Sequence, residues 1–231
     1  MSHLIEAFRI ALNMVFSGDG AVYSIAVRTL LIAGSATLIS SVLFIPLGCL
    51  VHFSRFRGKG FVVSVIQALY SVPTVLVGML VFIFISRAGP LGSLGLLFTP
   101  AAIVIGEVIL VAPIITGLTV STLRGTGDEV RDTALSLGAG TGRMVMKVLA
   151  ESREAILTAM LIAFGRTVSE VGIAIMVGGN ISGYTRTLTS TIVLGVGRGE
   201  TALSMALGII LLALAMLVSI SAGALRKGGR K

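Results

Sequence analysis

Long apolar runs separated by short polar segments dominate this chain. About 20 consecutive apolar residues are enough for a helix to cross the ~30 Å hydrocarbon core of a membrane. Four stretches reach that length: Thr29 to Val51, Gly60 to Ser86, Ala101 to Leu123, which carries only Glu107, and Thr201 to Leu225. A fifth span, Ala155 to about Gly179, is interrupted by Arg166 and Glu170. The pattern therefore predicts an all-α integral membrane protein with five transmembrane helices, forming a single transmembrane domain over residues 1–231.

The first 20 residues have a different, amphipathic pattern. Four apolar residues fall on one face of a helix over residues 1–16: Leu4, Phe8, Leu12 and Val15. A helix of this kind lies in the membrane interface rather than across the membrane. Glu6 and Arg9 interrupt the apolar stretch that a cleaved signal peptide would need. We therefore expect an N-terminal interfacial helix within residues 1–20, ended by the turn signal Ser17 to Gly20.

The distribution of lysine and arginine between the spans predicts the orientation of the chain. Twelve of these residues lie in the first loop, the third loop and the C-terminal tail: Arg55, Arg57, Lys59, Arg124, Arg131, Arg143, Lys147, Arg153, Arg226, Lys227, Arg230 and Lys231. Five lie on the opposite side: Arg9, Arg28, Arg87, Arg186 and Arg198. Because loops rich in Lys and Arg stay on the cytoplasmic side, we expect the N-terminus outside and the C-terminus inside.

The composition is also that of a membrane protein. Hydrophobic residues make up 55% of the 231 residues and charged residues 12%, whereas a soluble domain carries about 25% charged residues. The net charge of +8 does not indicate nucleic-acid binding, because the basic residues are not interleaved with aromatic ones and the chain has no Trp. Cys49 is the only cysteine, and neither His3 nor His52 has a second ligand near it in the sequence, so no metal site is expected.

The loop between the third and fourth predicted spans, residues 124–154, has the charge pattern of an exposed helix. Acidic residues at positions 128–132 precede a short apolar segment, and basic residues at positions 143 and 147 follow it. This order suits the helix dipole, which favours acids near the N-terminus and bases near the C-terminus. We expect a short helix that ends at Gly138, where glycine allows a tight turn. A solvated helical loop without a partner is the simpler alternative.

Four positions of this loop form a spaced motif, with three residues before its glycine: Asp132, Thr133, Ala134 and Gly138. The motif resembles the EAA loop of ABC importer permeases, which reads Glu-Ala-Ala, three residues, Gly, and Val148 matches an aliphatic position further on. Asp and Thr replace the first two motif residues, and Glu151 stands where many members have proline. The resemblance implies that these four residues, together with Arg143, couple the chain to an ATPase.

Three later segments narrow the resemblance to the oxyanion importers. They read Phe-Gly-Arg-Thr-Val-Ser-Glu-Val-Gly at 164–172, Val-Gly-Gly-Asn-Ile at 177–181 and Gly-Tyr-Thr-Arg-Thr-Leu at 183–188. Molybdate and sulfate permeases have similar segments. The Ser-Glu-Val-Gly and Val-Gly-Gly-Asn-Ile forms, and the segment from Arg87 to Pro100, are more similar to tungstate permeases. Tungstate is the implied substrate, and molybdate or sulfate is the alternative.

The resemblance implies a type I ABC importer permease in the cytoplasmic membrane of a prokaryote. In this family two permease subunits form a homodimer within the lipid, two ATPase subunits bind the cytoplasmic face, and an extracytoplasmic binding protein delivers the oxyanion. The sequence has no Gly-x-x-x-x-Gly-Lys-Ser/Thr phosphate loop. We therefore expect a subunit that is not an enzyme and holds no cofactor, with ATP and Mg²⁺ on the partner ATPase.

Charged residues close to the predicted spans are candidates for the transport pathway. Arg166 and Glu170 are four residues apart on one helix, so they can pair as a gate or anion-guiding charge, or simply as a structural pair. Arg186, between Thr185 and Thr187, offers a cation with hydroxyl donors to an oxyanion, and a surface arginine is the plain alternative. Glu107 is expected to pack or hydrogen-bond inside the protein rather than to bind a ligand.

Two other classes of membrane protein compete with this interpretation. An ion-coupled secondary carrier would use Arg166 and Glu170 as its relay, but it leaves the loop of residues 124–154 without a function. A membrane-embedded enzyme lacks candidates, because no paired His and acid, no Gly-x-Ser-x-Gly elbow and no metal-ligand cluster occur in the spans. An ATP-driven importer subunit accounts for the loop as well as for the spans.

Overall fold

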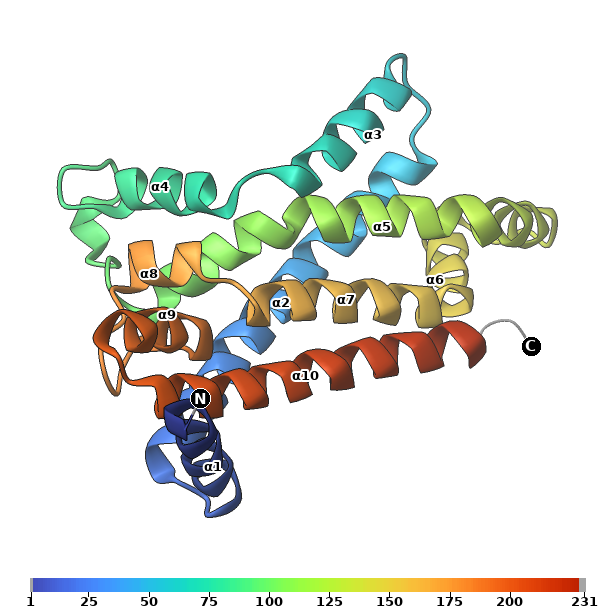
Figure 1. The fold of residues 1–231 in the computed structure, drawn as a ribbon. Helices are drawn as coiled ribbons and strands as arrows, with labels where there is room; N and C mark the ends of the chain where they lie inside the picture. The colour runs from blue at the N-terminus through green and yellow to red at the C-terminus, as the bar shows by residue number, and fades with distance from the viewer. Residues whose placement is uncertain (1, 229–231) are drawn as a thin grey trace.

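The computed structural model describes the backbone of residues 2–228 and the side chains of residues 5–124 and 128–225. Within these residues all regular structure is helical, and Figure 1 labels the helices in chain order. Their bounds are α1 Ser2–Phe16, α2 Gly20–Phe53, α3 Lys59–Ala68, η1 Leu69–Ser71, α4 Thr74–Ile85, η2 Gly92–Leu94, α5 Pro100–Ser136, α6 Thr141–Glu151, α7 Arg153–Val168, α8 Gly172–Gly178, α9 Leu188–Arg198 and α10 Thr201–Gly228. The all-α fold predicted from the sequence is confirmed.

Three single helices among the described residues are long and apolar enough to cross a membrane: Gly20–Phe53, Pro100–Arg124 and Thr201–Leu225. Two bent helix pairs also meet that test, α3–η1 with α4 and α7 with α8. The five predicted spans are therefore all present, with each bent pair counted as one span. Figure 1 shows α5, α7 and α10 running alongside one another while α2 crosses them at an angle.

The second predicted span is not one continuous helix. The chain bends by 95° between η1 and α4, at Val72 and Pro73, both of which have extended backbone angles. Proline lacks the N–H that a helix needs at that position, and its ring disfavours the helical conformation of the residue before it. The span predicted over residues 60–86 is therefore present as two helices, and Pro73 is the physical reason for the break between them.

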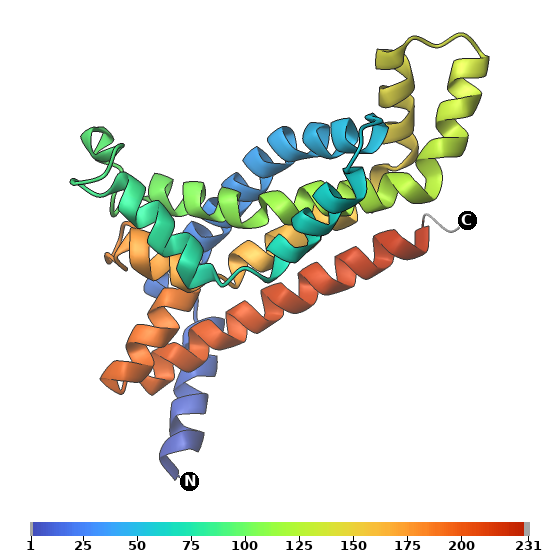
Figure 2. The same cartoon turned by 90° about the horizontal axis from the view of Figure 1, so that it is seen from above.

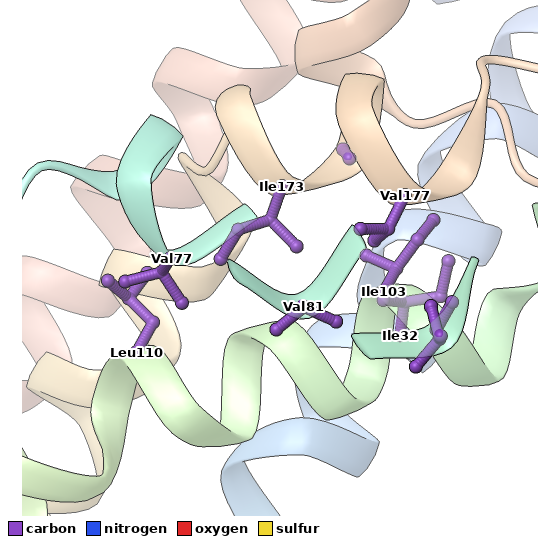
Figure 3. Close-up of a cluster of buried hydrophobic side chains, with 10 residues drawn as sticks. Ile32, Val77, Val81, Ile103, Leu110, Ile173 and Val177 are labelled. Carbon is purple, nitrogen blue, oxygen red and sulfur yellow. The ribbon is translucent and has the colours of Figure 1, made fainter. Parts of the chain in front are cut away.

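The main core lies where four helices meet. Figure 3 shows Ile32 of α2, Val77 and Val81 of α4, Ile103 and Leu110 of α5, and Ile173 and Val177 of α8 pointing toward one another. These side chains are buried against each other. Because lipid is as apolar as these side chains, close van der Waals packing holds such helices together in a membrane.

A small residue lets α2 and α5 approach very closely where they cross. A Cβ placed on Gly48 of α2 would stand 2.7 Å from the Cβ of Thr119 and 2.9 Å from the carbonyl oxygen of Thr116, both in α5. These atoms belong to the helix backbone or lie next to it, so they cannot swing aside. Only glycine fits at this position without moving one of the helices.

The N-terminal helix predicted from the sequence is present as α1. It packs on α10 through the buried residues Ala7 and Ala11, and Figure 2 shows it projecting from the rest of the bundle. The turn after it places Asp19 at the start of α2, where its side chain accepts hydrogen bonds from the backbone N–H groups of residues 21 and 22, at 2.9 and 3.1 Å. The location of α1 in the membrane interface stays a prediction.

Some residues used in the sequence predictions fall outside the described parts of the chain. They are Arg230 and Lys231 as a whole, and the side chains of His3, Leu4, Arg226 and Lys227.

Candidate functional site

The loop of residues 124–154 is built from two helices. α5 continues without interruption to Ser136, so the short separate helix expected from the sequence is instead the last part of this long helix. α6 then turns back against it, and Figure 2 shows the pair standing out from the bundle. We call residues 124–151 the α5–α6 hairpin. The helix does not stop at the end of the apolar run, because the polar residues that follow contain no proline before Ser136.

Gly138 makes the turn of the hairpin. Its φ of +78° lies in the left-handed region that favours glycine. The N–H of Ala139 donates to the carbonyl of Ala134 and the N–H of Gly138 donates to that of Leu135, both at 3.0 Å. These two bonds form a Schellman motif, which satisfies carbonyl groups left free at a helix end. The prediction that Gly138 ends the helix is therefore confirmed.

The five predicted coupling residues differ in exposure. Four are exposed on the hairpin: Asp132, Thr133, Gly138 and Arg143. Ala134 is buried instead, in a cluster with Met144 and Val148 of α6 and with Cys49 and Leu123. Ala134 and Val148 therefore hold the two arms of the hairpin together, and the four exposed residues lie on its outer surface.

A groove of about 600 Å³ runs along the hairpin. Its walls include three of the predicted coupling residues, and the lining residues are Glu129, Val130, Thr133, Ala134, Leu137, Ala139, Arg143, Lys147 and Glu151. The lining combines apolar side chains with charges of both signs, including the Lys147–Glu151 ion pair at 3.7 Å. A groove of this chemistry suits contact with another protein surface.

Leu137 is a residue of this surface that the sequence prediction missed. It sits at the tip of the hairpin with 83% of its surface exposed, directly before the turn glycine. Leu135 and Met146 of the same hairpin are exposed as well, and several exposed apolar side chains on one projecting element suit contact with a partner. The position of Leu137 next to Gly138 was the signal available in the sequence.

Arg166 and Glu170 pair as the spacing predicted. The Arg166 Nη1 atom lies 2.9 Å from the Glu170 Oε2 atom, with 35% of the arginine side chain exposed and 1% of the glutamate side chain. The other carboxylate oxygen, Oε1, accepts hydrogen bonds from the backbone N–H groups of Gly172 at 2.8 Å and Ile173 at 3.3 Å. Glu170 thus bridges the 59° bend between α7 and α8 as well as holding the arginine.

The hydroxyl groups of Thr185 and Thr187 hold the backbone of the loop between α8 and α9. Thr185 Oγ1 donates to the carbonyl of Gly178 at 2.5 Å and accepts from the N–H of Ile181 at 2.9 Å. Thr187 caps α9 by a reciprocal exchange with Ser190, a capping box. Both threonines are buried, so they shape this loop and do not present free donors.

Arg186 lies in the same loop and is tied to α2 through its backbone. Its carbonyl accepts from Arg28 Nη1 at 3.3 Å, and Arg28 Nη2 donates to the carbonyl of Gly183 at 2.9 Å. The Arg186 Nε atom is buried without a hydrogen-bond partner. The sequence analysis used Arg28 only in the count of basic residues that predicts orientation. Nothing in the sequence relates Arg28 to a loop that lies more than 150 positions further along the chain.

The Arg166–Glu170 pair and Arg186 are linked through α9. Thr189, in the first turn of α9, donates its hydroxyl hydrogen to the carbonyl of Glu170 at 2.5 Å. No hydrogen bond or ion pair between described residues joins the two arginines directly. Across the described part of the chain, no three His, Cys, Asp or Glu side chains come together in a way that could hold a metal ion.

Comparison with known proteins gives one family and several close relatives. The family model described as "Binding-protein-dependent transport system inner membrane component" matches residues 44–231. The tungstate uptake system permease protein TupB of Peptoclostridium acidaminophilum is 38% identical over 194 residues, which cover 84% of this chain and 85% of that protein. A probable anion ABC transporter permease protein of Haloferax volcanii is 37% identical, over 77% of this chain and 78% of its own length. The TupB protein of Campylobacter jejuni is 33% identical, over 87% and 84%.

Proposed function

This chain belongs to the family of binding-protein-dependent transport system inner membrane components, and we propose that it is the transmembrane subunit of an ATP-driven tungstate importer. Two relatives at 38% and 33% identity carry tungstate uptake in their names, and both match most of the chain. A molybdate or sulfate importer of the same type is the second candidate. An ion-coupled carrier is not favoured, because it gives the exposed α5–α6 hairpin no function.

The α5–α6 hairpin is the proposed contact with the ATPase. The proposal that this chain is coupled to ATP hydrolysis rests on the structure of the hairpin. Its arms are fixed by an internal apolar cluster, its tip is fixed by the Gly138 turn, and Leu137 projects from that tip. A rigid helical element that presents an apolar anchor and charges of both signs fits a groove on a partner. In this proposal ATP and Mg²⁺ are held by the ATPase, and this chain binds no cofactor.

The assembly contains two copies of this chain, two ATPases and an extracytoplasmic oxyanion-binding protein, in the cytoplasmic membrane of a prokaryote. The N-terminus lies outside and the C-terminus inside. Lipid covers exposed apolar side chains such as Leu212 and Ile220 of α10. When the ATPases close, the hairpins move with them and the helices tilt as rigid bodies, so that access to the pathway alternates between the two sides.

The candidate pathway residues are Arg166, Glu170 and Arg186. The partly exposed Arg166 offers a guanidinium, the group that best matches an oxyanion, while Glu170 keeps its geometry fixed. Arg186 offers a second guanidinium in the loop between α8 and α9, which Thr185 and Thr187 hold in shape. Selectivity among tetrahedral oxyanions would rest largely on the binding protein.

The substrate is tested by elemental uptake. Cells lacking the gene are pulsed with trace tungstate, molybdate and sulfate, and tungsten, molybdenum and sulfur are measured per cell. We expect a selective loss of tungsten uptake that returns when the gene is restored. Normal uptake of all three elements, in a strain without a redundant transporter, would refute the substrate assignment.

The coupling assignment is tested at the hairpin tip. Leu137→Ala removes most of a side chain that is exposed in this subunit, so the chain itself should stay folded. If Leu137 is buried by the ATPase, the loss of about 1–2 kcal/mol weakens ATPase binding roughly 5- to 30-fold. Gly138→Trp adds a bulky side chain at a turn whose positive φ favours glycine. We expect this variant to insert into the membrane, with ATP hydrolysis no longer driving uptake.

The control for both variants is Leu212→Ala, which truncates a similarly exposed leucine on α10, away from the hairpin. Binding is measured with purified ATPase and the chain in lipid nanodiscs, and uptake in vesicles. Unchanged ATPase affinity for Leu137→Ala, or normal uptake by Gly138→Trp, would contradict the coupling role.

A further inference from the structure

The short loop between α2 and α3 carries basic residues that the transport and coupling proposals do not use. Arg55 and Arg57 are exposed, and Lys59, the first residue of α3, is half-buried. We call these three residues the first-loop patch. No Asp or Glu occurs in the sequence between Asp19 and Glu107, so the patch has no acid near it along the chain. It is a cluster of positive charge alone.

The rest of the subunit does not neutralise this charge. Neither Arg55 nor Arg57 forms an ion pair or a side-chain hydrogen bond with any residue that the structure describes. Lys59 donates to the backbone carbonyl of His52, at the end of α2, and this bond supplies no counter-charge. Asp128 approaches the same end of α2, but it faces the ring of His52, with 3.8 Å between Oδ1 and Nε2.

The loop lies at the edge of the hydrocarbon core. It has five residues, 54–58, between the end of α2 at Phe53 and the start of α3 at Lys59. Leu50 before the loop and Phe61 after it are 64% and 74% exposed. On helices that span a membrane, lipid covers exposed apolar side chains of this kind. The patch lies between these two side chains in the sequence, so its charges reach the level of the lipid headgroups.

An apolar contact fixes the loop at the hairpin end of the bundle. Val51 of α2, Val63 of α3 and Val120 of α5 are buried against one another. Of the ten described residues of α3, only Val63 is buried. Figure 1 shows the loop end of α3 standing away from α5 and α7. The patch therefore occupies an outer edge of the subunit, on the same side of the membrane as the α5–α6 hairpin.

We propose that the first-loop patch binds the phosphate headgroups of anionic phospholipids in the leaflet on the hairpin side. Guanidinium groups match the geometry of phosphate oxygens, and the lysine ammonium adds a point charge. Clusters of lysine and arginine directly beyond a membrane span attract anionic lipid. Phe56, which lies between the two arginines and is exposed, enters the boundary between headgroups and acyl chains.

Lipid fits the patch better than the ATPase does. The proposed ATPase contact, the α5–α6 hairpin, combines apolar side chains with charges of both signs, as in the Lys147–Glu151 pair. The first-loop patch has one sign of charge and lies between lipid-facing side chains. A leaflet with anionic headgroups presents negative charge above an apolar layer, which complements this pattern. The binding is independent of which anion is transported.

A tryptophan reporter tests the site directly, because the chain contains no tryptophan. The full chain with Phe56→Trp is placed in lipid nanodiscs that contain phosphatidylcholine and phosphatidylglycerol in a fixed ratio. One lipid or the other carries brominated acyl chains, which quench a tryptophan that they touch, and the ratio of quenching gives the headgroup preference at position 56. We expect brominated phosphatidylglycerol to quench more strongly, and added salt to weaken the preference. Equal quenching by the two lipids would overturn the proposal.

Variants without the arginines locate the preference. Arg55→Gln/Arg57→Gln in the reporter chain should lower the preference for phosphatidylglycerol roughly tenfold. Both side chains are exposed, so the chain should stay folded. Arg87→Gln/Arg198→Gln is the matched control, because it removes two exposed arginines that the sequence predicts on the opposite side of the membrane. An equal loss of preference in both variants would show an effect of total charge and refute the site.

The ATPase is the competing occupant, and the same reporter detects it. Purified ATPase is added to the nanodiscs, and the quenching is measured against the chain without the reporter. We expect the lipids to quench the reporter as strongly as before. Protection of the reporter from both brominated lipids would assign the patch to the ATPase and refute lipid binding. Loss of the tungstate assignment alone would leave the quenching result standing.

Discussion

The crossing of α2 and α5 at Gly48 predicts that a single methyl group there destabilises the subunit. In Gly48→Ala the new Cβ would lie 2.7 Å from the Thr119 Cβ and 2.9 Å from the Thr116 carbonyl oxygen, both well inside van der Waals contact. Overpacking of this kind costs about 1–3 kcal/mol. The substitution also gains about 1 kcal/mol of helix propensity, which offsets part of that cost.

Gly34→Ala is a matched control on the same helix. A Cβ at Gly34 has no neighbouring atom within 4 Å, so this variant gains the propensity without the clash. The difference between the two variants therefore isolates the steric cost of about 1–3 kcal/mol. For a chain of this length, that difference corresponds to a gap of roughly 2–12 °C between their thermal midpoints.

Thermal stability is measured by heating the purified chain in one detergent and following the monodisperse fraction by size-exclusion chromatography. All variants are heated at the same rate, because midpoints of irreversible unfolding depend on that rate. We expect Gly48→Ala to melt below Gly34→Ala. Equal midpoints for the two variants would show that α2 and α5 do not depend on the close approach, and would refute the reasoning.

Three further predictions concern charges at helix ends and loops. The double variant Arg166→Glu/Glu170→Arg, which exchanges the two charges, should not transport, because an arginine at position 170 cannot accept hydrogen bonds from the α8 N–H groups as Glu170 does. Full uptake by this variant would show that only the ion pair between the two side chains matters. Asp19→Ala should lower stability by about 1 kcal/mol through loss of the α2 cap, while Asp19→Asn should not; equal thermal midpoints for both would exclude a capping role. Arg28→Met should free the 183–186 loop, seen as faster amide hydrogen exchange there, and unchanged exchange would contradict its tethering role.

The spans were predictable because a membrane imposes a simple requirement. A helix that crosses the hydrocarbon core needs a long apolar run with few or no charges. Such runs are visible in the sequence at residues 29–51 and 201–225, which carry no charge, and at residues 101–123, where Glu107 is the only one. The turn at Gly138 was predictable for a similar reason, since a glycine after a short helical segment is a local signal. The ion pair of Arg166 and Glu170 followed from their spacing on one helix.

The helix bend at Pro73 was not predictable in the same way. Transmembrane helices often tolerate proline, because neighbouring groups satisfy the freed carbonyls. Whether a proline bends the chain slightly or by 95° depends on what packs on either side. Here Gly78 lets α4 lie closely on α8, with a Cβ at that position only 3.3 Å from the Ile173 Cα atom, and this tertiary contact is not visible in a single sequence.

The second role of Glu170 and the helix α9 were missed because both depend on contacts across the sequence. Glu170 caps α8 because it lies in the three-residue break between α7, which ends at Val168, and α8, which begins at Gly172. Apolar patterning does not mark this boundary. The segment of α9 reads as an external connection, and its capping box of Thr187 and Ser190 is a weak local signal. The exposed position of Leu137 likewise depends on the direction in which the hairpin projects.

The tight crossing of α2 and α5 lies near one end of the membrane-spanning part of α5. That part, Pro100–Arg124, has 25 residues and is about 37 Å long. Beyond it the helix changes direction, and Figure 2 shows its last part turning away from the bundle together with α6. Thr119, which faces Gly48, lies about 28 Å from Pro100 and about 8 Å from Arg124. In the proposed coupling, a small tilt about this crossing at the hairpin side would therefore become a larger displacement of opposite direction at Pro100. At that end the N–H of Phe98 donates to the carbonyl of Val177 at 2.8 Å, and this bond would carry the displacement into α8.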